Sequence, residues 1–329
     1  IPSGRLDPAA QVLLEVVPLP NRPGIANNYL GQAERDREDD QVNLRLDYSM
    51  AGGDLLFGRL SIGQIEALEP FGARGSNALP GFPSLVNTNS RNAVVSYTRN
   101  LSSRHVMNVL LGYNYVDGGI NTQNQDLEIA RRAGIQVLQD VSPELSGVPA
   151  VNTTFTSPFG DDLSTLIRTN STYQASAQFF FSTGRHGLTY GAEVMRHRFE
   201  PLAAINARGS MTFTGRYTAG TTTGTNGNGF ADFLLGLPSS GSVLSGNAIE
   251  RARSTWYGVF VQDNWRVRDD LTVNLGLRYD LMPPFYDEDN RLSAIDVEGR
   301  RVIVSSSDGQ VGDGADFARY ASFPLPFVT

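Results

Sequence analysis

The amino-acid sequence predicts an all-β fold: an antiparallel up-and-down transmembrane β-barrel segment of about eight strands, carrying long extracellular loops. Eight segments alternate apolar and polar residues, the pattern of a strand with two different faces. Most are about 9–12 residues long, close to the ~9–11 that a tilted strand needs to cross hydrocarbon. The links between them alternate between short and long, as the periplasmic turns and extracellular loops of membrane barrels do.

The alternation sets the limits of each expected strand. In residues 105–116, Val109 and Leu111 lie on one face and Asn108 on the other, and residues 271–281 show the same pattern. Alternation alone fits either a barrel in lipid or a soluble sandwich, so the strand lengths and the links decide between them. The expected strands are 41–49, 54–63, 91–100, 105–116, 171–181, 186–196, 254–267 and 270–281.

The links have the composition of turns and loops. Residues 218–229 are rich in Gly, Thr and Asn, which is typical of a surface loop. A short helix is expected within 123–140, and 230–241 is expected to form a helical turn against either the lumen wall or the other loops. The expected hairpin turns are 50–53, 101–104, 182–185 and 267–270, and the expected long links are 64–90, 117–170, 197–253 and the tail from 282.

The composition excludes several classes of function. The formal net charge of −7 gives no basic surface for nucleic acid. The sequence has no Lys and no Cys, which removes lysine-dependent nucleotide loops, thiol nucleophiles and cysteine-ligated metals. No run approaches the ~18 apolar residues of a membrane helix. The first residues do not resemble a signal peptide, so the protein is either not exported or part of a longer precursor.

Several stretches resemble a known family. YGVFVQDNWRVRDDLTVNLGLRYD (257–280), followed by PPFYDEDNRLSAID (283–296), is similar to the barrel of TonB-dependent outer-membrane receptors, in particular the large Oar-like members with an N-terminal carboxypeptidase-regulatory-like domain. Residues 1–21, 40–61 and 230–241 fit the same barrel. The resemblance implies a bacterial outer-membrane location and uptake of a bulky solute through a plugged barrel of about 22 strands, powered through TonB.

The sequence also departs from that family. It shows no plug, no TonB box and no closing strand with a terminal aromatic residue. The alternating links put residues 1–40 and 282–329 on the loop side, whereas the ends of a complete small barrel normally lie in the periplasm. We therefore expect residues 1–329 to be a partial receptor barrel domain without plug, N-terminal domain or C-terminal strands. The TonB complex would then act through the missing segments.

Two sets of residues are candidates for functional positions. One set is polar and expected to face the lumen, where its members either line a substrate path or plug surface, or only pair with one another: Arg45, Asp47, Asn108, Asn114, Glu193, Gln262, Asn274, Arg278 and Asp280. The other set is aromatic and suits the girdles at the two membrane surfaces: Tyr113, Tyr115, Tyr257, Trp265 and Tyr279.

No catalytic residue, metal site or cofactor is predicted. His186 and His197 lie near opposite ends of one expected strand, too far apart to share a metal, and His105 is expected to begin a strand. The acidic clusters 36–40 and 287–290 lack the spacing of an EF-hand loop and are expected to be solvated. In 271–281, Leu271, Val273, Leu275 and Leu277 are expected to face lipid. Asp263 falls on that side of the preceding strand, so it either reaches headgroup level or follows a bulge.

The expected partners are outer-membrane lipid, a bulky solute of unknown identity and, through missing segments, the TonB complex, but no nucleic acid. Transport in the bacterial outer membrane by a non-enzymatic receptor is the first hypothesis. A structural or adhesive outer-membrane barrel without transport is the second. A soluble β-sandwich binding module is the third, and it requires the apolar face of each strand to be buried in a protein core.

Overall fold

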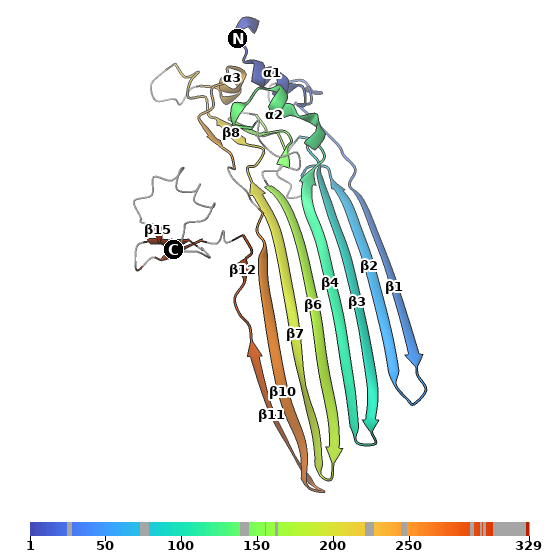
Figure 1. Cartoon of the computed structure of the whole chain (residues 1–329). Coiled ribbons are helices and arrows are strands. Elements are labelled where there is room, and N and C mark those ends of the chain that lie inside the picture. The colour runs from blue at the N-terminus through green and yellow to red at the C-terminus, as the bar shows by residue number, and fades with distance from the viewer. Residues whose placement is uncertain are drawn as a thin grey trace.

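The computed structural model describes residues 1–24, 28–72, 79–138, 145–154, 156–161, 164–220, 227–244, 249–289, 293–296, 298, 301–304 and 327–328. One antiparallel sheet of long strands dominates it, with the helices gathered at one end (Figure 1). The strand order is β1-β2-β3-β4-β6-β7-β10-β11. The strands are β1 (Asp36–Ser49), β2 (Leu55–Glu69), β3 (Ser84–Ser102), β4 (His105–Thr122), β6 (Ser164–Thr183), β7 (His186–Ile205), β10 (Ala252–Arg268) and β11 (Leu271–Leu281). All eight expected strands are therefore present, and each pairs with its neighbours in sequence.

Most strands extend beyond their expected limits at the end opposite the hairpin turns. β6 and β7 each contain 20 residues, and β3 contains 19. The added part of β3 reads Asn87-Thr88-Asn89-Ser90 and still pairs with β2 and β4. Antiparallel pairing persists there although the apolar alternation has ended, because the ladder is made by backbone N–H and C=O groups and not by the side chains. The long links are correspondingly shorter than expected.

The hairpin turns descend steadily across the sheet (Figure 1). One cross-strand row runs through Ser49, Leu55, Thr98, Asn108, Gln178, Gly191, Phe260 and Arg278. The first hairpin ends on this row, whereas the regular pairing of the last hairpin ends at Arg266 and Thr272, six residues lower. A drop of six residues at ~3.3 Å across six strand spacings of ~4.8 Å corresponds to a strand tilt of about 35°. Closed membrane barrels have strand tilts of about 35–45°.

The sheet is open in the described part of the chain. β1 pairs only with β2, and β11 pairs only with β10. After β11 the chain bends at residues 282–285, and the short strand β12 (Tyr286–Asp287) rejoins β10 one residue out of register. Side chains alternate between faces, so without the shift Tyr286 would share a face with Arg278 and Asp280. The shift places Tyr286 on the opposite face.

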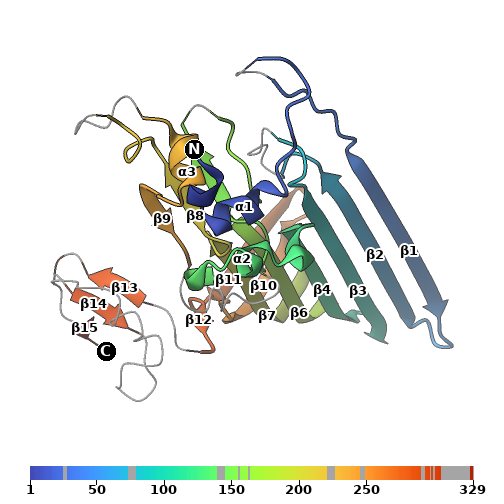
Figure 2. The ribbon, with the colours of Figure 1, turned by 90° about the horizontal axis from the view of Figure 1, so that it is seen from above.

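The long links and the N-terminal segment pack into a small unit at the loop end, here called the cap (Figure 2). It contains α1 (Pro8–Leu14), α2 (Ile129–Arg132), α3 (Gly229–Leu234) and a sheet of β5 (Ala150–Thr153), β8 (Ser210–Phe213) and β9 (Ser240–Ser242), together with the 3-10 turns Ser3–Arg5, Gln125–Leu127 and Gln136–Leu138. The expected helix within 123–140 is α2, and α3 packs on the other loops. Within the described part of the chain, every helix is too short or too polar to span a bilayer.

A buried cluster holds the cap together. Its members come from segments far apart in the sequence: Ala10, Leu13, Phe82, Ile129, Val148, Val151, Phe159, Phe213 and Phe233. Phe233 lies at its centre, with ring centroids 5.5 Å from Phe159 and 5.4 Å from Phe213. Farther along the chain, β13 (Ser293–Asp296) pairs antiparallel with β14 (Arg301–Val304), and β15 (Phe327–Val328) pairs parallel with β14.

Candidate functional site: the two faces of the sheet and the loop cap

Cross-strand pairing divides the side chains of the sheet into two faces, because directly paired residues point the same way. One face, here called the outer face, carries an apolar band across all eight strands, and its side chains remain exposed: Leu46 is 67% exposed and Leu277 is 73% exposed. A β-sandwich would bury these side chains, and the described residues provide no second layer over them. The soluble-sandwich hypothesis is therefore wrong, and the outer face has the surface that lipid requires.

All nine residues expected to face the lumen lie together on the opposite, inner face. The registers place them on β1, β4, β7, β10 and β11: Arg45, Asp47, Asn108, Asn114, Glu193, Gln262, Asn274, Arg278 and Asp280. Asn114 pairs in register with Asn92, and Asn274 pairs with Asn264. The face assignment made from alternation thus agrees with the pairing, while a transport role for these residues remains a prediction.

The two edges of the inner face carry the same local arrangement. Arg45 donates two hydrogen bonds of 2.8 Å to Asp47, and Arg278 donates from Nε at 2.9 Å to Asp280. Each guanidinium also lies over a phenylalanine of the neighbouring strand, Phe57 at 4.5 Å and Phe260 at 5.9 Å. Arg278 additionally pairs with Glu193. The sequences LRLD (44–47) and LRYD (277–280) give this motif, since residues two apart on a strand share a face.

Other inner-face side chains also bond to one another. Asn108 donates to Ser96 at 2.9 Å and to Thr98 at 2.8 Å, and Gln262 donates to Asn264 at 3.1 Å. The inner wall is therefore a polar surface whose members largely satisfy each other. This arrangement suits a wet lumen, and it gives no single residue the surroundings of a catalytic group.

The predicted girdle aromatics all lie on the outer face. Tyr113 packs on Tyr173 with ring centroids 5.0 Å apart, and both lie five residues above the cross-strand row defined earlier. With Tyr115, Tyr257 and Tyr279 they form what we call the tyrosine band, near the loop end of the outer face. Trp265 lies at the turn end instead, stacked on His186 at 5.6 Å. Their role at the membrane surfaces remains a prediction.

Asp263 stays on the outer face. The pairing of β10 is regular from Tyr257 to Arg266, so no bulge switches the face before the turn. The carboxylate instead reaches Nδ1 of His186, 2.6 Å away at the turn end. The alternative of a face-switching bulge is therefore wrong, whereas contact of Asp263 with lipid headgroups remains a prediction.

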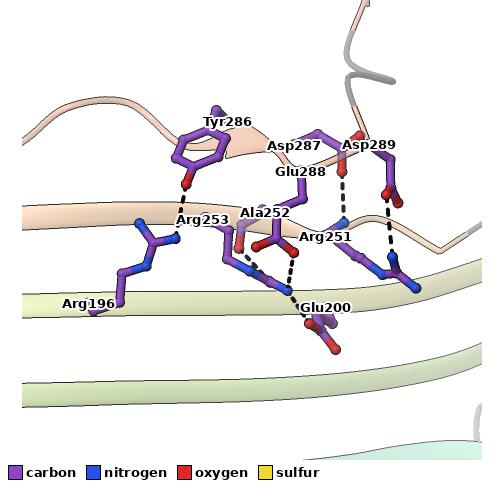
Figure 3. Close-up of polar contacts among 9 residues, drawn as sticks. All are labelled: Arg196, Glu200, Arg251, Ala252, Arg253, Tyr286, Asp287, Glu288 and Asp289. Atoms are coloured by element: carbon purple, nitrogen blue, oxygen red, sulfur yellow. Dashed lines mark hydrogen bonds and ion pairs between the residues drawn. The ribbon is translucent and has the colours of Figure 1, made fainter. Parts of the chain in front are cut away.

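Ion pairs gather where β12 returns to β10 (Figure 3). Arg253 is buried and pairs with Glu200 of β7 and Glu288. Arg251 binds Asp289 at 3.3 Å, and its backbone N–H donates to Asp287 at 2.9 Å. The stretch 287–290 was expected to be a solvated loop. In its described part, Glu288 and Asp289 stay partly exposed while they pair with Arg253 and Arg251. These contacts fix β12 on the sheet.

The cap is joined to the sheet through a buried polar cluster. Arg208 donates to Ser146 O at 2.9 Å, to Asn121 of β4 at 3.1 Å and to Thr165 of β6 at 2.5 Å. Asp161, 3% exposed, accepts from the backbone N–H of Val148 at 2.7 Å and from Asn124 at 2.8 Å.

Burial raises the pKa of Asp161 above its ordinary value, although hydrogen bonds from Thr122, Val148 and Asn124 and the charge of Arg208 partly oppose the shift. A carboxyl held in this way is a structural joint between the cap and β4, because its partners come from both.

The N-terminal segment is docked on α3. Asp7 caps α1 by accepting from the N–H of Ala10 at 3.1 Å, and its own N–H donates to Leu234 O at 2.9 Å. Gly236 ends α3 with φ +69°, and a Cβ there would lie 2.6 Å from the Asp7 carboxylate. Glycine is therefore required on both counts at this contact.

The histidines do not converge on a site. His186 begins β7, His197 lies near its other end, and His105 begins β4 among Phe179, Phe181 and Tyr190. Within the described residues, no group of three His, Asp or Glu side chains could hold a metal ion.

No curated protein matches the chain significantly. Among solved structures, the outer membrane transporter YddB from Escherichia coli is similar, with 11% sequence identity and a TM-score of 0.41. The match covers 77% of this chain and 34% of YddB, so the chain spans about a third of that protein's length.

The model of the outer membrane beta barrel domain family matches residues 1–323, nearly the whole sequence. A membrane-facing outer surface, a polar inner wall and tilted antiparallel strands are the features that this family requires. The chain therefore belongs to the outer membrane beta-barrel domain family, and its location is the bacterial outer membrane.

Proposed function

We propose that this chain is part of the wall of a TonB-dependent, Oar-like outer-membrane receptor that imports a bulky solute. The open sheet is the observation that carries this proposal. β1 and β11 each leave one backbone edge unpaired among the described residues, and both cross the apolar band. In hydrocarbon each unsatisfied backbone group costs several kcal/mol, so both edges need further strands.

A barrel of the width that the resemblance implies would allow transport. Eight strands closed on themselves leave an interior that side chains fill, whereas a barrel of about 22 strands has a lumen that takes a plug. The polar inner face, with Arg45, Asp47, Glu193 and Arg278 among its charges, suits a wall that contacts water, a plug and a passing solute. The resemblance of residues 257–280 to TonB-dependent receptors supports the proposal that TonB supplies the energy for import.

The test measures uptake by living cells. Cells producing the full-length protein, with and without TonB, are grown in a complex medium, and mass spectrometry records which solutes disappear. The proposal expects at least one bulky solute to be depleted only when both proteins are present. Depletion that does not need TonB would indicate a passive channel. No depletion in any strain would contradict uptake.

Adhesion is a second candidate, and the cap favours it. Its buried aromatic cluster gives the loop end a fixed shape, and a fixed shape is what a cell-surface binding site needs. Under this alternative, replacing the cap core by mutation abolishes attachment of cells to a surface while the solute profile of the medium stays unchanged. Loss of uptake together with loss of the cap would instead assign the cap to the import path.

A further inference from the structure

Three arginines of the outer face form a compact group that we call the arginine belt: Arg91 of β3 and Arg196 and Arg198 of β7. The register places Arg91, Tyr115, Ser171 and Arg198 on one cross-strand row, and Tyr173 and Arg196 on the row two residues lower. Strand spacing of ~4.8 Å puts Arg91 and Arg198 about 14 Å apart, with tyrosines between them.

The belt has no acidic partner among the residues that the structure describes. The guanidinium of Arg198 lies 5.5 Å from the centre of the Tyr173 ring, and that of Arg91 lies 5.9 Å from the Tyr115 ring. Arg196 donates at 2.8 Å to Thr255 and at 2.9 Å to Tyr286, both neutral oxygens. Most of the five N–H donors on each guanidinium remain available to an anion.

Three carboxylates lie near the belt. On the next row toward the loops, Asp117 accepts from Thr169 at 2.6 Å, and Glu200 pairs with the buried Arg253. Arg253 shares a row with Arg198, but Glu200 and Glu288 neutralise it. Four arginines and three carboxylates therefore leave a net charge of +1 here, and the guanidiniums without a carboxylate partner among the described residues are those of the belt.

The height of the belt is fixed by the tilt. Relative to the line from Tyr113 to Tyr279, Arg91 is one residue row higher, Arg196 two rows and Arg198 four rows. A row adds about 2.7 Å of height at a tilt of about 35°, so the belt lies about 3–11 Å beyond that line, and Tyr115, two rows above the line, lies level with Arg196. Aromatic girdles mark the edge of the hydrocarbon, and the polar headgroups begin just beyond it.

We propose that the arginine belt binds the phosphate groups of an anionic lipid in the outer leaflet. Planar guanidinium groups bind phosphate oxygens in pairs of parallel hydrogen bonds, and the tyrosine faces below hold the guanidiniums in place. The acyl chains of the same lipid would lie on the apolar band below Tyr113 and Tyr173. Charge, height and the apolar surface beneath all select a lipid rather than a soluble protein for this position.

The experiment titrates the full-length protein in detergent with lipid A, and native mass spectrometry gives the Kd of the first bound lipid. The test variant is Arg196→Gln/Arg198→Gln. The matched control is Arg59→Gln/Arg168→Gln, which removes two arginines from the inner face. Arginine near an anionic membrane surface contributes about 1 kcal/mol, so the test variant should bind about 30-fold more weakly. The control should stay within about twofold of wild type.

Two further arms identify the ligand. Lipid A without its phosphates should bind the wild type about as weakly as intact lipid A binds the test variant, and inorganic phosphate at millimolar concentration should not displace lipid A. Equal binding by the test variant and wild type would overturn the proposal, as would displacement by inorganic phosphate, which would indicate a site for the free anion. Should the double variant not fold, Arg91→Gln should weaken binding about fivefold.

Discussion

Placing arginine on each face of β4 tests the assignment of the two faces. Val109 pairs with Tyr97 and Ala177 on the outer face, whereas its neighbour Leu110 pairs with Ser96 and Ser176 on the inner face. Along the strand, Val109 lies midway between His105, at the turn, and Tyr113, in the tyrosine band. Val109→Arg therefore puts a charge near the middle of the apolar band, while Leu110→Arg puts the same charge on a polar wall.

The expected magnitudes differ strongly. An arginine on the lipid face of a membrane barrel costs about 2–4 kcal/mol at mid-depth, so Val109→Arg should lower the folding equilibrium constant between about 30-fold and about 900-fold. Leu110→Arg should cost less than about 1 kcal/mol, because a wet lumen hydrates the charge and inner-face acceptors surround it. The free energy of unfolding of the full-length protein in lipid vesicles, measured by guanidinium titration, separates the two variants.

Equal costs for the two variants would refute the reasoning, because a face that does not contact lipid has no reason to reject the charge. A reversed order would show that the polar side chains point outward. Measuring both variants again in thinner vesicles provides an internal check. The Val109→Arg cost should fall there, because a thinner bilayer brings the headgroups closer to the charge.

Three further predictions concern the cap and the inner wall. Phe233→Ala should destabilise the cap by about 3–5 kcal/mol, seen as faster protease cleavage on whole cells, while Leu237→Ala, whose side chain is 40% exposed, should have little effect. Because burial raises the pKa of Asp161, its carboxyl group binds a proton more tightly in the folded cap than in the unfolded chain. Protonation of Asp161 therefore stabilises the cap increasingly as the pH falls toward 3.8. Asp161→Asn should abolish that part of the pH dependence of protease resistance. A double-mutant cycle with Glu193→Gln and Arg278→Gln should give a coupling energy below about 1 kcal/mol, since both groups contact water; a larger value would mean that the wall is dry there.

The strands could be predicted from the sequence because lipid imposes a strict pattern. Wherever a strand crosses the apolar band, as at 105–116 and 271–281, one face must be apolar, so alternation marks the strand. Above the band that constraint ends, and the extension of β3 through Asn87 and Asn89 left no signal in the sequence. The bend at residues 282–285 was likewise invisible, because a one-residue register shift depends on how β12 meets β10.

The cap could not be predicted because its core is assembled from distant, isolated residues. Leu13, Phe82, Val148 and Phe233 each stand in a different segment, and none belongs to a periodic run. Only FADFLL (230–235) carried a local signal, an apolar helical turn broken by Gly236. The arginine belt has the same origin: Arg91 and Arg198 are 107 positions apart in the sequence, and only the registers of three strand pairs place them on one row.

The turns and the tyrosines give two independent measures of the membrane plane, and these agree. The turns descend six residue rows across six strand spacings. The line from Tyr113 of β4 to Tyr279 of β11 descends four rows across four spacings, with Tyr173 and Tyr257 one row and Tyr115 two rows above it. Backbone connections set the slope of the turns, and side-chain chemistry sets the slope of the tyrosines. In a sheet outside a membrane, nothing would make these two slopes equal. The two lines are parallel and about 20 Å apart at a tilt of about 35°, somewhat less than the ~25 Å apolar band of outer-membrane barrels. The residues between them therefore form the membrane wall, and the cap and the arginine belt lie on its extracellular side.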